Sequence, residues 1–173
     1  MHEPASTLAA VATGCVAAVA FRRLLLAGSD QVAEMVARSV VALLVGAALA
    51  FAVGLFARGC DLDRDRAFYP TVTIVVASYY ALFAIMGAST RALVLESLVG
   101  AVFVALAVLG FRSSLWVVVV ALAAHGIFDL VHGTAISNPG VPGWWPQFCL
   151  TYDVAAAGYL AWLLKSGRIR AAT

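Results

Sequence analysis

Long apolar runs alternate with short polar breaks along the whole chain. A helix needs about 20 mainly apolar residues to cross a bilayer. The breaks contain glycine, proline, serine and charged residues, which are typical of turns; the first comprises Gly28, Ser29 and Asp30, and the last extends from Asn138 to Pro146. The pattern therefore predicts six antiparallel membrane spans, at residues 6–27, 32–57, 70–88, 92–111, 114–134 and 147–165.

Composition supports an all-α polytopic bundle rather than a water-soluble domain. Hydrophobic residues make up 64% of the 173 residues and charged residues only 12%, with a mean hydropathy of +0.99. Soluble domains carry about 25% charged residues, so we expect lipid to solvate most of this surface and residues 1–173 to form one transmembrane domain. Cys15, Cys60 and Cys149 show no paired spacing, and no basic stripe suggests a nucleic-acid partner.

The basic residues predict that both termini are cytoplasmic. The N-terminal run lacks the positive leader of a signal peptide and is expected to stay as the first span. Six spans place both termini on one side, which then holds seven basic residues against four on the other, and the positive-inside tendency favours the richer side as cytoplasmic. Arg22 and Arg23, at the end of the first span, locally favour the reversed topology, which stays open as the alternative. The richer side holds Arg58, Arg64, Arg66, Arg112, Lys165, Arg168 and Arg170; the other holds Arg22, Arg23, Arg38 and Arg91.

A few ionisable residues lie inside the predicted spans, where each costs at least about 2.5 kcal/mol if it faces lipid at the bilayer centre. We therefore expect them to face the bundle interior. Counted from the span ends at about 1.5 Å per residue, four of them reach a similar depth in the outer third of the membrane. These four are Glu96, Asp129, His132 and Asp153.

His125, Asp129 and His132 lie within about 60° of one helical face and form a polar stripe. Imidazoles and carboxylates without a thiolate suit zinc, iron or manganese. We predict His125, His132 and Asp153 as ligands of a divalent metal, Asp129 as an orienting group or fourth ligand, and Glu96 as general acid or base. Glycine and alanine beside these positions would let the helices approach closely.

Two other interpretations of this cluster stay open. The same side chains could form a hydrogen-bonded cluster that only fixes helix packing, although such bonds give about 0.6 kcal/mol on average. They could also relay protons or coordinate an ion during transport. A haem bound between His125 and His132 is excluded, because two residues seven apart on one helix cannot ligate opposite faces of one iron.

Other polar and aromatic positions are weaker candidates for substrate contact. Glu34 and Arg38 are four residues apart and are expected to pair, with anion binding by Arg38 as the alternative. Packing is the favoured role of the mid-span tyrosines, and membrane anchoring that of the tryptophans in the last loop, although both sets could line or cover a pocket. The charged loop at residues 61–66 is interpreted as solvated rather than as a calcium site. The substrate or lid candidates are Arg38, Tyr79, Tyr80, Asn138, Trp144 and Trp145.

Several strings resemble those of a family of small bacterial multi-span integral membrane proteins. The resemblance covers roughly residues 65–160 and implies a helical bundle in the bacterial inner membrane, without an established activity. The ligand chemistry is also similar to that of ceramidase-like intramembrane zinc hydrolases, but those have seven spans and more histidine ligands, so no residue roles are carried over. The strings are Asp65 to Pro70, Ala77 to Tyr80, His125 to Asp129 with His132, and Gly140 to Cys149.

Taken together, the sequence predicts a membrane protein with membrane lipids around it and a metal-assisted site that hydrolyses a lipid or another apolar small molecule by water activation. The alternatives are ion-coupled or proton-coupled transport, binding of a small ligand, and an accessory membrane subunit whose polar cluster is purely structural.

Overall fold

The computed structural model describes the backbone of residues 5–169 and the side chains of residues 30–169. This part of the chain forms helices and contains no strand. It divides into two units, Met1–Val40 and Val41–Thr173. Helix α1 (Ala5–Gly59) supplies the described part of the first unit and the beginning of the second.

The break predicted at residues 28–30 is wrong, because these residues are helical within α1. Gly28 costs a helix about 1 kcal/mol, and Ser29 and Asp30 cost less. No proline interrupts this stretch, and the high helix propensity of the surrounding alanine and leucine residues is enough to continue the helix across the three unfavourable positions. The predicted span 6–27 lies outside the residues whose side chains are described and stays a prediction.

The second unit continues with a short helix η1 (Leu62–Arg64) and four long helices. The side chain of Ser89 accepts a hydrogen bond from the backbone of Ala92 and caps α3; Ser114 caps α4 in the same way. Pro146 stands in the first turn of α5, where its missing N–H costs nothing. The four long helices are α2 (Phe68–Met86), α3 (Thr90–Arg112), α4 (Leu115–Ala135) and α5 (Trp145–Lys165).

Four helical segments are long and apolar enough to cross a membrane: Asp30–Gly59, Phe68–Met86, Thr90–Arg112 and Leu115–Ala135. They correspond to the predicted spans 32–57, 70–88, 92–111 and 114–134, so a membrane helical bundle is supported while the number six is not confirmed. Helix α5 is not among these segments. It is as long as α4, but Gln147, Thr151 and Asp153 lower its hydropathy.

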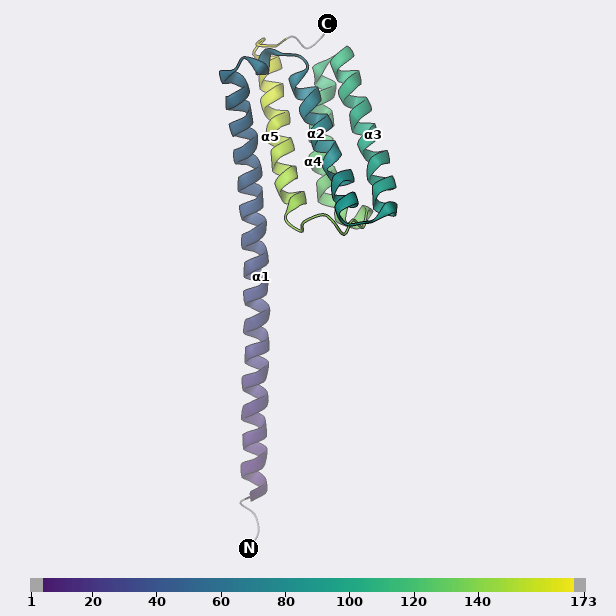
Figure 1. Ribbon diagram of the computed structural model, residues 1–173. Coiled ribbons are helices and arrows are strands. Elements are labelled where there is room, and N and C mark those ends of the chain that lie inside the picture. The colour runs from purple at the N-terminus through teal and green to yellow at the C-terminus, as the bar shows by residue number, and fades with distance from the viewer. Residues whose placement is uncertain (1–4, 170–173) are drawn as a thin grey trace. The chain divides into compact units, whose positions relative to one another are not determined.

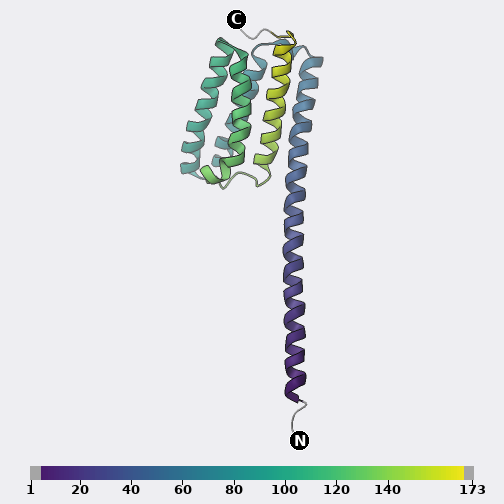
Figure 2. The ribbon, with the colours of Figure 1, turned by 180° about the vertical axis from the view of Figure 1, so that it is seen from behind.

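The second unit packs as an antiparallel bundle, and Figures 1 and 2 show α2 to α5 side by side from opposite directions. Helix α2 packs against α3, α4 packs against α5, and α4 also contacts α2 and α3. Fully buried leucines join α4 to α5 from the middle of the bundle to the end where α4 begins and α5 ends: Leu115, Leu122, Leu160 and Leu163. One end of the bundle carries the α2–α3 and α4–α5 connections, and we call it the site end.

The opposite end holds the charged loop. Asp61 pairs with Arg64 at 3.4 Å, as expected of local pairing. Asp63, however, is buried and accepts a hydrogen bond of 3.4 Å from the Tyr159 hydroxyl, so the loop is not uniformly solvated. Arg66 donates to the carbonyl oxygens of Gly110 and Phe111 and thereby ties the loop to the last turn of α3.

Gly46 is required where α1 crosses α5 within the second unit. A Cβ atom at this position would lie 2.1 Å from the carbonyl oxygen of Phe148 and 2.4 Å from Oγ1 of Thr151. The Thr151 hydroxyl on α5 also donates to the backbone carbonyl of Leu43 on α1 at 2.8 Å, so a side-chain hydrogen bond joins the two helices beside the glycine. Glycine at such a crossing is typical of membrane helices.

We expect Gly46→Ala to lower the thermal unfolding midpoint of the detergent-purified protein by several degrees, because the new methyl group forces α1 away from α5. Gly54→Ala is the matched control on the same helix, since its Cβ would meet the Tyr159 ring at an ordinary 3.5 Å. Equal midpoints for the two variants would contradict the close crossing.

Candidate metal centre

Five ionisable side chains are buried together near the site end of the bundle, at positions in α3, α4 and α5: Glu96, His125, Asp129, His132 and Asp153. Each is at most 2% exposed. Because the helices are antiparallel, residues near the start of α3 and α5 reach the same level as residues near the end of α4. The structure therefore brings together Glu96, Asp129, His132 and Asp153, whose depths counted from the span ends were predicted to be similar. His125 lies one helical turn deeper than Asp129.

The first pair joins α4 to α5. Nδ1 of His125 lies 2.7 Å from Oδ2 of Asp153 and 3.8 Å from Oδ2 of Asp129. Gly126 makes this approach possible, because a Cβ at that position would already stand 3.1 Å from the carbonyl oxygen of Leu150 on α5. One imidazole nitrogen thus faces two carboxylates.

The second pair joins α4 to α3. Nε2 of His132 lies 2.7 Å from Oε1 of Glu96. The Asn138 amide, from the α4–α5 connection, donates to the same Oε1 and to the carbonyl oxygen of Tyr80, both at 3.0 Å. Asn138 therefore holds the loop against the pair and orients the Glu96 carboxylate.

Tyr80 of α2 links the two pairs. Its hydroxyl donates to Oδ1 of Asp129 at 2.6 Å. Its ring stacks on the imidazole of His132, with centroids 3.8 Å apart and planes at 14°. The result is one buried polar network with contributions from all four helices α2 to α5.

Two carboxylate oxygens of this network, Oδ2 of Asp129 and Oδ1 of Asp153, have no hydrogen-bond partner among the described residues. Leaving a buried carboxylate oxygen unsatisfied is costly, so these positions call for a proton or a cation. Together with His125, the two aspartates offer ligand atoms that all lie within 4.8 Å of one another. This buried group could hold a metal ion.

The distances indicate what metal entry would require. Ligand atoms of a tetrahedral zinc site with bonds of about 2.0–2.1 Å stand roughly 3.3 Å apart. The 3.8 Å between His125 and Asp129 needs a small contraction, whereas the widest separation in the group, up to 4.8 Å, needs a larger one of up to about 1.5 Å. The 2.7 Å between His125 and Asp153 is a hydrogen-bond length, so an ion would replace the proton between these atoms and spread them slightly.

The group differs from the predicted ligand set of His125, His132 and Asp153. Asp129 joins it as a candidate ligand, whereas His132 is engaged by Glu96. Seven residues separate the two histidines along α4, a rise of about 10 Å. Sharing one helical face therefore does not by itself bring both imidazoles to one ion, and His132 as a ligand stays a prediction.

The other predicted contact residues divide between the network and its surroundings. Tyr80 and Asn138 belong to the network, while Tyr79 and Trp145 pack together at 5.1 Å between ring centroids and line a separate pocket. Trp144 is exposed. Arg38 forms the expected ion pair with Glu34 in the first unit, and both side chains are exposed.

A pocket of about 230 Å³ lies against Asp129 between α4 and the start of α5, but the Asp129 side chain itself is covered, at 0% exposure. Leu130, Gly133, Pro146 and Gln147 line the rest of it. Gly133 leaves space there, since a Cβ at this position would meet no atom within 4 Å. The pocket brings water or an ion close to Asp129, whose carboxylate is covered in this structure.

Sequence reasoning did not single out Cys149, which is buried at 2% exposure on α5. The available signal was its spacing, because Cys149 and Asp153 are four residues apart and share one face of the helix. Tyr80 was identified only as a pocket or packing residue, because its partner Asp129 is 49 positions away in the chain.

Comparisons of the chain with protein-family models, with curated proteins and with solved structures find no match. Any assignment of function must therefore come from the geometry of the network itself. What that geometry provides is a buried group of His125, Asp129 and Asp153 that could hold a metal ion, with a second histidine–carboxylate pair beside it.

Proposed function

We propose that this membrane protein binds one divalent metal ion at His125, Asp129 and Asp153 and uses it to hydrolyse a lipid or another apolar substrate. The observation that carries the proposal is the pair of unpartnered carboxylate oxygens beside one imidazole, buried within an apolar bundle. Ionisable groups in such a place are expensive and mark functional sites.

The donor set suits zinc, iron or manganese, which accept imidazole and carboxylate ligands. Three protein ligands leave a coordination position open for water, as catalytic sites require. A metal bound there would lower the pKa of that water and polarise a carbonyl group. The pocket beside Asp129 supports this proposal, since it brings water close to the ligand group, and a movement of the side chains that cover the carboxylate would admit it.

The Glu96–His132 pair is suited to proton transfer in this reaction. Hydrolysis forms a bond between the water oxygen and the acyl carbon and breaks the bond from that carbon to the leaving oxygen or nitrogen. The proton lost by water must reach the leaving atom. We assign Glu96 as the group that accepts and returns it, with His132 and Asn138 fixing the carboxylate through bonds of 2.7 and 3.0 Å.

Metal analysis of the detergent-purified protein tests the proposal. We expect about one equivalent of metal per chain, and at least tenfold weaker binding in Asp153→Asn, which keeps the side-chain shape but loses the anionic ligand. Asp63→Asn is the matched control, because Asp63 is equally buried but lies at the opposite end of the bundle. Metal-free wild-type protein after supply of zinc, iron and manganese, or equal loss in both variants, would refute the metal site.

Proton or ion transport is the second candidate, favoured by the continuity of the network from Glu96 on α3 to Asp153 on α5. The path stops there, because the bundle beyond the network is filled by Val118, Leu122 and Leu160, all at 0% exposure. Metal-free protein that takes up protons or ions into vesicles would favour this candidate over hydrolysis.

A further inference from the structure

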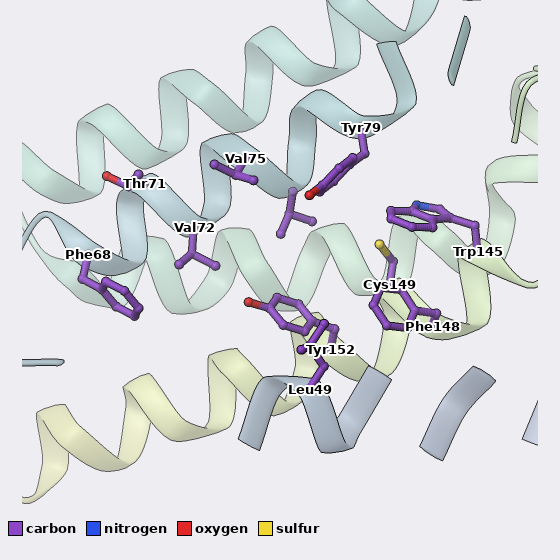
Figure 3. Close-up of a pocket in the computed structure, with 11 residues that line it drawn as sticks. Leu49, Phe68, Thr71, Val72, Val75, Tyr79, Trp145, Phe148, Cys149 and Tyr152 are labelled. Carbon is purple, nitrogen blue, oxygen red and sulfur yellow. The ribbon is translucent and has the colours of Figure 1, made fainter. Parts of the chain in front are cut away.

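A second pocket, of about 250 Å³, lies beside the metal centre between α1, α2 and α5 of the second unit. Figure 3 shows its lining side chains converging from these helices. Apolar residues form most of the wall, among them Leu49, Val72 and Val75. None of these residues belongs to the polar network, so this pocket requires an explanation of its own.

The pocket is long and parallel to the helices. Its lining residues on α2 extend from Phe68 to Tyr79, a rise of about 16 Å along the axis. Lipid acyl chains run in the same general direction as membrane helices. An extended alkyl chain therefore matches both the apolar wall and the orientation of the pocket.

Polar atoms gather at the site end of this pocket. The Trp145 indole nitrogen is buried and, within the described part of the chain, has no hydrogen-bond partner. The Cys149 thiol points into the pocket between Tyr79 and Trp145 (Figure 3). A buried N–H without an acceptor is unfavourable. The nitrogen is covered in this structure although the Trp145 ring lines the pocket, so a ligand carbonyl oxygen would complete it after a turn of the indole ring.

The same end adjoins the metal centre. Cys149 lines the pocket and lies one helical turn before Asp153, and Tyr152, which also lines the pocket, directly precedes it. A chain lying in the pocket would thus place its polar end beside the residues that could hold the ion.

We propose that this pocket binds the single alkyl chain of an acyl ester or amide, with the carbonyl group at Trp145 and Cys149. The assignment rests on the proposed function, for which it names the substrate class and the residues that select it. The apolar wall determines chain binding, and the indole N–H distinguishes an acyl compound from a plain hydrocarbon.

Photo-crosslinking in lipid nanodiscs tests chain binding, with a 16-carbon fatty acid that carries a diazirine along its chain as the probe. We expect labelling of pocket residues on α2 and α5, reduced at least tenfold by Val75→Trp, which fills the pocket. Val120→Trp is the matched control, because Val120 is also exposed but lies on α4 and does not line the pocket. Labelling spread over all helices, or equal labelling of the two variants, would overturn the assignment.

A second arm tests the carbonyl position. Trp145→Phe keeps an aromatic ring but removes the N–H donor. We expect about tenfold weaker binding of the fatty acid, which is the usual effect of losing one hydrogen bond, and unchanged binding of a diazirine-bearing hydrocarbon. An equal change for both probes would overturn the carbonyl assignment. Labelling of the Asp153→Asn variant separates the two proposals. If the pocket is still labelled in this variant without bound metal, the pocket proposal holds even where the metal centre fails. If the wild type binds metal but its pocket is not labelled, only the pocket proposal is refuted.

Discussion

Replacing His125 by alanine is expected to lower the free energy of unfolding by about 3–5 kcal/mol, as is usual when one partner of a buried ion pair is removed. His125 is the only described side chain that contacts Asp153 through a hydrogen bond, at 2.7 Å, and it also faces Asp129 at 3.8 Å. Without it, Asp153 keeps two unpartnered oxygens in an apolar interior. Reversible unfolding by SDS in mixed micelles, with metal removed by a chelator, measures the change.

A double-mutant cycle separates the broken pair from the cavity that alanine leaves. We expect His125→Ala/Asp153→Ala to be less destabilised than the sum of its single variants by about 1–3 kcal/mol, because the double variant leaves neither group unpaired. Glu34→Ala is the control for a surface carboxylate: its pair with Arg38 is exposed and is worth less than about 1 kcal/mol. Additive single effects would contradict a coupled pair of His125 and Asp153.

The helices of the second unit could be predicted from the sequence because membrane spans obey a length rule. Each of the four later predicted spans falls on a helix whose ends differ by at most two residues. The prediction fails at Gly28 to Asp30. The low helix propensity of these residues was interpreted as a turn between two spans, although no proline prevents the helix from continuing. The length rule is also insufficient for α5, whose polar residues, among them the buried Asp153, lower its hydropathy without changing its place in the bundle.

The depth of the candidate site in the bundle could be predicted from the sequence, but not which histidine pairs with which carboxylate. Depth counting along antiparallel helices places Glu96, Asp129 and Asp153 at one end, and the structure has them there. Which carboxylate meets which histidine depends on the neighbours of α4, with α3 beside His132 and α5 beside His125. Spacing within one helix contains no information on that order.

Glu96→Gln is expected to separate catalysis from metal binding. The amide has nearly the shape of the carboxylate, and its oxygen can still accept from His132 and Asn138, which bind Oε1 at 2.7 and 3.0 Å. The variant should therefore fold and retain its metal. It loses the group that accepts the proton of water, and removal of a general base typically lowers turnover by about 10²- to 10⁴-fold. Hydrolysis of a long-chain 4-nitrophenyl ester by the metal-loaded protein measures the effect.

The comparison with Glu34→Gln makes the result specific, since that residue is exposed in the first unit and should leave turnover unchanged. Loss of metal together with turnover would show that Glu96 supports the metal centre rather than the proton transfer. Turnover within a few-fold of the wild type would remove Glu96 from the reaction. A metal-loaded wild type without esterase or amidase activity would refute hydrolysis while leaving the metal site intact, because the ligand group of His125, Asp129 and Asp153 does not include Glu96.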